Sequence, residues 1–245
     1  TMQMRGGVSR YFYELILGLK RLGHSPVVNG GCNKNIFFDA LPANVKTGVY
    51  FDSYPPKTSR VINKISNFYS LAQGSVGAQD IFHQTYFNMP LAKRKLPTVI
   101  TVHDMIHEKY PEFFPPGDPT RAAKKRAVLS SDLIIAVSQN TRDDIINFYD
   151  VPPSQVRVVH HGVGLQKQAE KSVQRNFVLY VGTRSGHKNF LNLLQAFSLS
   201  SISDEVVLYC VGGGPFTYSE TDLINKLGLA SRVVQENVGE NALAA

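Results

Sequence analysis

Short β-branched runs that alternate with helix-forming stretches are the feature that most constrains how this chain folds. The clearest runs of this kind cover residues 97–102, 132–137, 177–181 and 206–211. Each of them is followed by a turn or loop and then by a predicted helix. Strands and helices that alternate at this spacing predict parallel sheets with right-handed crossovers, so the expected fold class is α/β.

The alternating pattern is interrupted once, which indicates two domains. We expect a Rossmann-like domain over residues 1–163, a polar linker over 164–176 and a second Rossmann-like domain over 177–245. The last of these holds only about three predicted strands, too few for a complete domain of its kind. A glycine loop at Gly6 opens the first domain without the strand that normally precedes such a loop. We therefore expect a missing first strand and an incomplete second domain.

Several local patterns refine this arrangement. Apolar residues at helical spacing after Gly7 predict a helix that ends at Gly23. Residues 30–60 are rich in turn formers, and we expect them to be irregular. A further helix is expected to start at Ser138, where the pair Thr141 and Asp144 has capping-box spacing.

Cysteine usage and hydropathy exclude several classes of protein. Cys32 and Cys210 are the only cysteines in the sequence, and neither belongs to a CxxC or Cys/His pattern. We therefore expect neither a disulfide framework nor a zinc site, and a cytoplasmic setting fits best. The sequence has no apolar run of 18 or more residues, which argues against a transmembrane helix.

The formal net charge of +7 leaves three classes of partner open. Anionic small molecules such as nucleotide diphosphates, an anionic membrane surface and nucleic acid would each suit it. The basic residues form small groups at 93–95 and 124–126, without the interleaved aromatics of a nucleic-acid motif. We expect no nucleic acid partner and interpret both groups as solvated faces, with peripheral contact to an anionic membrane as the alternative.

Histidines and glycines at predicted strand ends are candidates for the first half of a ligand site. Gly6 and Gly7 precede a helix whose first amides are free to bind an anion, although a simple tight turn is an equal alternative. His103 follows the strongest strand and is the candidate catalytic residue, with a structural role as the alternative. For His83 the structural role is favoured. A metal shared by the adjacent residues 160 and 161 is not expected, because neighbouring strand residues point to opposite faces.

The predicted second domain offers candidates for a phosphate site. Arg184 and Lys188 lie four residues apart beside a helix start, which suits a diphosphate clamp. Two solvated cations are the alternative. Gly213 and Gly214 follow the next strand and permit close backbone approach to a ligand, or form a plain turn.

The order of these motifs resembles that of family 4 glycosyltransferases, whose fold is GT-B. The resemblance spans nearly the whole chain and is closest to a bacterial, mannosyltransferase-like branch of surface-polysaccharide assembly, especially over residues 80–114. It is carried by residues 6–11 (GGVSRY), 101–104 (TVHD), 137–138 (VS), 159–163 (VHHGV), 180–183 (YVGT), 188–189 (KN) and 211–215 (VGGGP).

The resemblance implies two facing Rossmann-like domains and a hexosyltransferase that retains the anomeric configuration. A nucleotide-diphosphate sugar donor would be held mainly by the second domain, and a glycan or lipid-linked glycan acceptor by the first. Neither a metal nor a cofactor is implied. By matching position, Gly7 would lie by the donor phosphates, His103 by the transferred sugar and Lys188 on the diphosphate.

Three departures from the family pattern qualify this resemblance. The arginine of the clamp usually stands where this chain has Thr183, one residue before Arg184. His161 and Gly162 replace an Asn-Gly pair. The paired-glutamate motif of the donor site is expected shortly after residue 245. A nucleotide-sugar epimerase of the same fold and a catalytically inactive sugar- or nucleotide-binding protein are therefore kept as alternatives.

Overall fold

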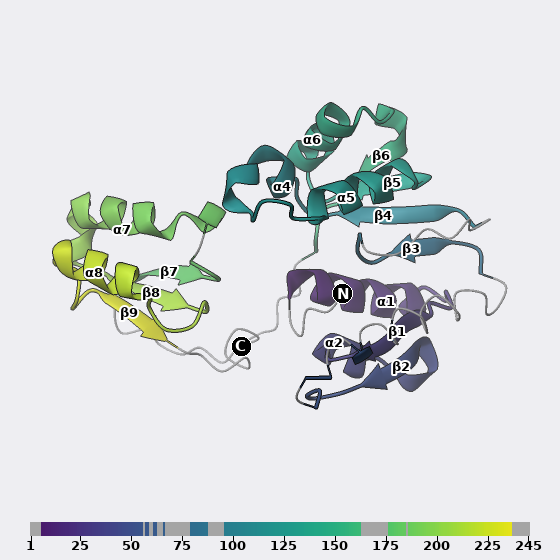
Figure 1. The fold of residues 1–245 in the computed structure, drawn as a ribbon, viewed down its shortest axis with the longest axis horizontal. Coiled ribbons are helices and arrows are strands. Elements are labelled where there is room, and N and C mark those ends of the chain that lie inside the picture. The colour runs from purple at the N-terminus through teal and green to yellow at the C-terminus, as the bar shows by residue number, and fades with distance from the viewer. Residues whose placement is uncertain are drawn as a thin grey trace. The chain divides into compact units, whose positions relative to one another are not determined.

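The computed structural model describes residues 6–55, 57, 58, 61, 62, 66, 79–87, 96–162, 176–184 and 186–236. The chain divides into two compact units, residues 1–161 and 162–245 (Figure 1). Each unit combines strands with packed helices, and all of the described strand pairs are parallel. The α/β fold class is thus confirmed. Residues 164–175 of the expected linker lie outside the described residues.

Two parallel sheets form the described part of the first unit. One has the order β1-β2 and the other the order β3-β4-β5-β6. Because all strands of the larger sheet run the same way, their carboxyl ends lie at one edge, where ligand sites of such folds form. The strands are β1 (Val28–Asn33), β2 (Lys46–Tyr50), β3 (Phe82–Gln84), β4 (Thr98–Val102), β5 (Leu133–Ala136) and β6 (Val156–Val158).

The first helix of the first unit agrees closely with the apolar periodicity, whereas α2 lies within the residues predicted to be irregular. The helix predicted after Gly7 begins there and ends before Gly23, which has a positive φ of 86°. The helices are α1 (Gly7–Arg21), α2 (Ile36–Asp39), α4 (Ile106–Lys109), α5 (Thr120–Leu129) and α6 (Gln139–Tyr149), with 3₁₀ turns η1 (Ala43–Val45), η2 (Pro111–Phe113) and η3 (Pro153–Gln155).

The N-terminal cap of α6 differs from the expected one. Ser138 has an extended backbone, and its Oγ accepts a hydrogen bond from the Thr141 amide at 3.1 Å. Thr141 is already helical, so the capping-box role predicted for Thr141 and Asp144 was wrong. Ser138 is the true cap because it is the last extended residue before the helix.

Residues 30–60 were wrongly predicted to be irregular, since β1 and β2 pair there in parallel. A Cβ on Gly48 would stand 2.5 Å from the carbonyl oxygen of Gly31, so glycine is required at this close approach. The strand register shifts between Asn29 and Gly31. Glycine has low strand propensity, which is why a pair of strands built around it was not recognised.

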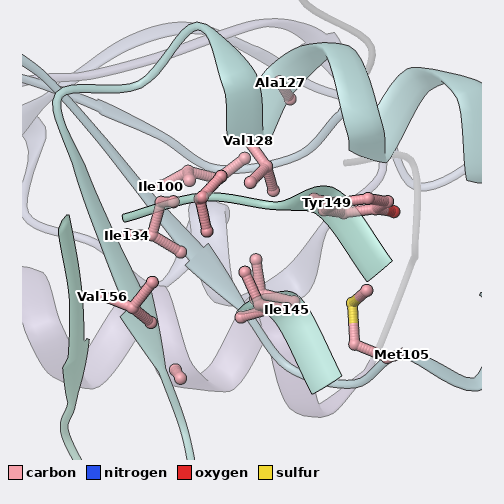
Figure 2. Close-up of a cluster of buried hydrophobic side chains, with 11 residues drawn as sticks. Ile100, Met105, Ala127, Val128, Ile134, Ile145, Tyr149 and Val156 are labelled. Atoms are coloured by element: carbon pink, nitrogen blue, oxygen red, sulfur yellow. The ribbon is translucent and has the colours of Figure 1, made fainter. Parts of the chain in front are cut away.

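An apolar core joins the larger sheet of the first unit to two of its helices. Figure 2 shows the buried side chains of β4, β5 and β6 meeting those of α5 and α6. Their burial fixes the strand ends that carry the polar residues described below. The core consists of Ile100, Val102, Met105, Ala127, Val128, Ile134, Ala136, Ile145, Tyr149, Val151 and Val156.

The second unit has one described sheet of order β7-β8-β9. Its helix α8 begins at Tyr218, where Thr217 and Glu220 form a reciprocal capping box. None of the described helices in either unit is long and apolar enough to cross a membrane. The elements are β7 (Phe177–Val181), η4 (Gly186–Lys188), α7 (Phe190–Leu199), η5 (Ser201–Asp204), β8 (Val207–Val211), α8 (Tyr218–Lys226) and β9 (Val233–Glu236).

Candidate functional site

The amino end of α1 presents open backbone in the first unit. Gly6 precedes the helix and no side chain caps its first turn. A Cβ added to Gly7 would meet no atom within 4 Å, so the space beside this glycine is open. Uncapped amides at a helix start can bind an anion. The donor-binding roles of Gly6 and Gly7 remain predictions that this geometry permits.

His103 lies just after β4, inside a small group of rings. Its Nδ1 is 3.4 Å from Nε2 of His161, and the two imidazoles stack with ring centroids 5.4 Å apart. Tyr11 of α1 meets both rings edge-on, at centroid distances of 5.2 Å from His103 and 4.9 Å from His161. The Nε2 atom of His103 is buried without a hydrogen-bond partner in the described part of the chain. His103 therefore has an unused hydrogen-bonding atom held in a fixed ring.

A threonine connects this ring group to a second histidine. The Thr101 Oγ1 atom lies 3.1 Å from the Tyr11 hydroxyl and 2.9 Å from Nε2 of His83. Thr101 and His103 are two residues apart at the end of one strand, so their side chains project to the same side. Sequence reasoning missed Tyr11, Thr101 and His161 as neighbours of His103. The alternation along the strand was the one available signal, and it pointed to Thr101.

Both half-buried histidines of this group are neutral at physiological pH. Burial lowers the pKa of His83 to about 4, and the nearby His103 adds to this effect. Burial likewise lowers the pKa of His103 to about 4, helped by His161 and opposed by Asp104. A neutral imidazole donates from one nitrogen and accepts with the other. His103 is thus suited to hydrogen bonding with a sugar hydroxyl rather than to acting as a cation.

The segment after His103 is held by a buried cation. Lys124 was interpreted as part of a solvated basic group, and this is wrong, because its side chain is only 1% exposed. It projects from α5 toward the core and donates to the Glu108 carboxylate at 2.8 Å and to the Asp104 carbonyl at 3.0 Å. Lys125 and Arg126 are exposed as expected. The other basic group, at 93–95, lies outside the described residues.

An open hollow of about 400 Å³ lies along the loop that follows α4. The ring of His107 stacks on Phe114 with centroids 3.8 Å apart, and the Nδ1 atom of His107 is buried without a partner among the described residues. The lining combines carboxylates, a guanidinium and aromatic rings, so the hollow offers both hydrogen-bonding groups and apolar surface. The lining residues are His107, Pro111, Glu112, Phe114, Pro115, Pro116, Gly117, Asp118 and Arg121.

In the second unit, Arg184 supports the glycine loop from within. Its Nε donates to Glu220 at 3.0 Å, and its Nη atoms donate to the carbonyl oxygens of Gly212 at 2.7 Å and of Gly214 and Pro215 at 2.8 Å. Only 3% of its side chain is exposed. Contact with a donor diphosphate stays a prediction for Arg184. The structure also shows that its guanidinium stabilises the glycine loop, which the sequence did not suggest.

The glycines of this loop allow its carbonyl groups to converge on the guanidinium. Gly212, Gly213 and Gly214 all have positive φ angles. A Cβ on Gly213 would lie 2.9 Å from the Arg184 Nη1 atom, whereas one on Gly214 would meet nothing within 4 Å. Donor binding by Gly213 and Gly214 therefore stays a prediction, with open space only at Gly214.

Lys188 contrasts with Arg184 because it is exposed. It ends the η4 turn just before Asn189, whose backbone is left-handed with φ of 55°. Asn189 precedes α7 but does not cap it with its side chain. No ion pair of Lys188 is found within the described ranges. An exposed ammonium beside uncapped helix amides can meet an anion, so donor binding by Lys188 stays a prediction that this geometry permits.

The predicted site residues are divided between the two units. Gly6, Gly7 and His103 belong to the first, while Arg184, Lys188, Gly213 and Gly214 belong to the second. Of the second set, the structure brings Arg184 together with Gly213 and Gly214. Within the parts of the chain that the structure describes, no group of three or more His, Cys, Asp or Glu residues is arranged to hold a metal ion.

A mannosyltransferase is similar to this chain in sequence. The O-antigen chain mannosyltransferase RfbU of Salmonella typhimurium is 25% identical over 232 residues, which cover 93% of this chain. The chain spans about two thirds of that relative, 65% of its length.

Solved structures with the same fold are also glycosyltransferases. The lipopolysaccharide outer core galactosyltransferase WaaB in its apo form matches 98% of this chain and 66% of its own, with a TM-score of 0.61 and 14% identity. Anabaena Alr3699/HepE in complex with UDP and glucose matches 94% of this chain and 65% of its own, with a TM-score of 0.59 and 17% identity.

A glycosyltransferase from Rickettsia africae matches 97% of this chain and 66% of its own, with a TM-score of 0.59 and 16% identity. At these identities the likeness shows the fold alone, and the fold is GT-B. The family model of Glycosyltransferase Family 4 matches residues 5–167. Because this family model matches more than half of the chain, the chain belongs to Glycosyltransferase Family 4.

Proposed function

We propose that the protein transfers a sugar from a nucleotide-diphosphate donor to a polysaccharide or lipid-linked glycan acceptor. The observation that carries this proposal is the family match over residues 5–167. The proposal includes retention at the anomeric carbon and transfer without a metal, which the family resemblance implies. A cytoplasmic enzyme, with peripheral contact to the inner face of the plasma membrane, is proposed with it.

Exposed and uncapped groups support a site for the donor diphosphate. Lys188 and the uncapped start of α7 can meet a diphosphate together in the second unit. The leaving diphosphate gains negative charge as the glycosidic bond breaks, so a cation there stabilises the transition state more than the bound donor. In the first unit, taken by itself, the uncapped start of α1 beside Gly7 leaves backbone amides free to bind an anion.

His103 is the proposed catalytic residue. Its ring meets Tyr11 edge-on and stacks on His161, and its buried Nε2 lacks a partner in the described structure. A polar atom buried without a partner is costly, and a ligand that supplies the hydrogen bond removes that cost. A hydroxyl of the transferred sugar is the proposed partner of this atom.

The hollow at residues 107–121 supports binding of the acceptor by the first unit. Glu112, Asp118 and Arg121 offer charged hydrogen-bonding groups, and the stacked pair of His107 and Phe114 offers aromatic surface. A sugar ring combines hydroxyls with apolar C–H faces, so it suits this mixture. The relative RfbU is named for an O-antigen chain, which is a polysaccharide of the same general chemistry as the proposed acceptor.

Release of free nucleoside diphosphate tests the proposed function and separates it from its alternatives. The full-length protein is incubated with a panel of nucleotide-diphosphate sugars, with and without glycan acceptor, and products are followed by mass spectrometry. We expect release that depends on the acceptor. Interconversion of the donor without acceptor would favour an epimerase. Calorimetric binding of nucleoside diphosphate without any turnover would favour an inactive binding protein, and either result would overturn the proposal.

A further inference from the structure

In the described part of the first unit, the most completely buried charged side chains form a network that bonds to the turn after the candidate catalytic residue. Lys124 is 1% exposed and Glu108 is 0% exposed, and they form an ion pair of 2.8 Å. The Tyr149 hydroxyl donates to the other oxygen of Glu108 at 2.5 Å. Three helices, α4, α5 and α6, each contribute one member of this network.

The ammonium of Lys124 also holds the main chain next to His103. It donates to the carbonyl oxygen of Asp104 at 3.0 Å and lies 3.8 Å from the Asp104 Oδ1 atom. Two of the three N–H donors of the ammonium are thus used in hydrogen bonds, to the Asp104 carbonyl and the Glu108 carboxylate, and the Asp104 carboxylate adds a longer ion pair. The Asp104 carboxylate in turn accepts from the Ile106 amide at 3.3 Å, at the start of α4. The turn from β4 into α4 is therefore tied to α5 through one side chain.

Stability alone does not account for a charged network at this position. Burying two charges carries a desolvation penalty that their attraction often fails to exceed, and apolar pairs of similar volume are frequently as stable. One member of the network, Tyr149, belongs to the apolar core together with Met105, Ala127 and Val128. What an apolar pair cannot supply is a donor to the Asp104 carbonyl, one residue after His103.

We propose that Lys124 is a positioning residue, which fixes His103 at the end of β4 by holding the Asp104 carbonyl and the Glu108 carboxylate. The proposal rests on the proposed function for its effect on catalysis. The ammonium acts through the backbone of the turn and touches neither donor nor acceptor. The Glu108 carboxylate orients the ammonium by accepting its hydrogen bond, and the Tyr149 hydroxyl orients the Glu108 carboxylate by donating to it.

A charge-neutral double variant tests this role without leaving a buried charge unpaired. In Lys124→Met with Glu108→Gln, the glutamine still accepts from Tyr149, while the Asp104 carbonyl loses its donor. We expect the variant to fold and kcat to fall on the order of ten- to hundredfold, since small misplacements of a catalytic group have effects of this size. The KM for the donor should stay within about twofold, because the donor-binding candidates of the second unit are untouched. Lys125→Met, on the exposed side of the same helix, is the matched control and should change nothing.

A second readout works without catalytic activity. The ring ¹H–¹⁵N signals of His103 in the full-length protein should shift in the double variant and remain unchanged in Lys125→Met. Absence of transfer by the unaltered protein would overturn the proposed function, while the His103 signals would still decide the positioning role. An unchanged kcat together with unchanged His103 signals would overturn the positioning role alone.

The Tyr149→Phe variant covers the case in which the double variant fails to fold. It keeps the ion pair and removes only the hydroxyl that orients Glu108. A smaller fall in kcat, about threefold to tenfold, with the same direction of shift in the His103 signals is expected. No shift and no fall in a folded Tyr149→Phe protein would then count against the role of the network.

Discussion

Each unit of the molecule supports a loop at a strand end with a buried cation and a buried glutamate, but the two cations do so differently. Lys124 in the first unit donates to one carbonyl and one carboxylate. Arg184 in the second unit donates to several carbonyls of the glycine loop and to Glu220, and its guanidinium lies 4.9 Å from the ring centroid of Phe216.

The difference follows from the chemistry of the two side chains. A guanidinium is a planar fork of five donors that stacks on aromatic rings, so one residue can organise a whole loop. An ammonium is a compact charge and fixes a single turn. A basic residue beside a strand end can therefore bind protein carbonyls instead of a ligand, as Lys124 and Arg184 do. Lys188, which is exposed, is the better candidate for the diphosphate than the buried Arg184.

The largest effect is expected on stability from Arg184→Ala. This variant leaves the buried Glu220 carboxylate without its cation and removes the donor to the loop carbonyls of Gly212, Gly213, Gly214 and Pro215. Breaking a buried pair by removing one partner costs about 3–5 kcal/mol. Denaturant unfolding of the second unit measures it. Lys226→Ala breaks only an exposed pair with Asp222 and, as the control, should stay within about 0.5 kcal/mol. Equal effects of the two variants would contradict a supporting role for Arg184.

Lys188→Ala should show the opposite profile, with a large effect on turnover and none on stability. Removal of one preorganised electrostatic group costs on the order of 10²–10³ in turnover, about 3–4 kcal/mol. Lys188→Arg should recover part of the loss, because the charge returns with a different geometry. Donor turnover of the full-length variants is measured, with thermal melts as the check on folding. Full activity in a well-folded Lys188→Ala protein would remove this residue from the diphosphate site and favour the inactive binding protein.

His103→Ala should lower kcat about ten- to hundredfold, the size expected for a positioned polar group. The effect is smaller than that of Lys188 because a neutral imidazole contributes a hydrogen bond rather than a full charge. His103→Gln, which keeps a side-chain donor, should retain more activity. Steady-state kinetics and melting curves of both variants are compared. If His103→Ala keeps activity within about threefold, the ring is structural and His103 is not a catalytic residue.

The regular elements were predictable because their patterns are local. The stripe of α1 and the β-branched run of β4 are each visible within a window of residues, and the structure places both where the sequence indicated. The pair β1 and β2 was missed because its defining residues, Gly31 and Gly48, look like turn formers in isolation. Their role becomes visible only when the two strands approach each other.

The supporting roles of the buried cations were not predictable from local sequence. Glu108 lies 16 residues before Lys124, and the carbonyls that Arg184 binds lie 28 to 31 residues after it. Within the sequence Lys124-Lys125-Arg126, nothing marks the first lysine as buried. The neighbours of His103 were equally unpredictable, because Tyr11 and His161 come from distant segments of the sequence. Contacts of this range require the fold itself.

The smallest expected effect is a difference between the units in how acid affects their stability. The folded pKa values of His83 and His103 are about 4, below the usual 6.5, so the unfolded chain takes up protons first as the pH falls. Stability of the first unit is therefore lost progressively from pH 6.5 toward 4. Between pH 7 and 5.5 the loss should stay below about 1 kcal/mol for each histidine, because water reaches both rings and screens them.

The second unit should lose stability only at lower pH. Burial raises the pKa of Glu220, but hydrogen bonds from Thr217 and Arg184 outweigh this and lower it below 4.5. Its stabilising contribution is present above pH 4.5 and is lost as the pH falls through the folded pKa. Hydrogen exchange between pH 7 and 5.5, corrected for intrinsic rates, separates the units. Greater loss of protection in β4 and β5 than in β7 and β8 is expected, and His83→Asn should reduce it. Equal loss in both units would show that the histidine pair does not set the acid response of the first.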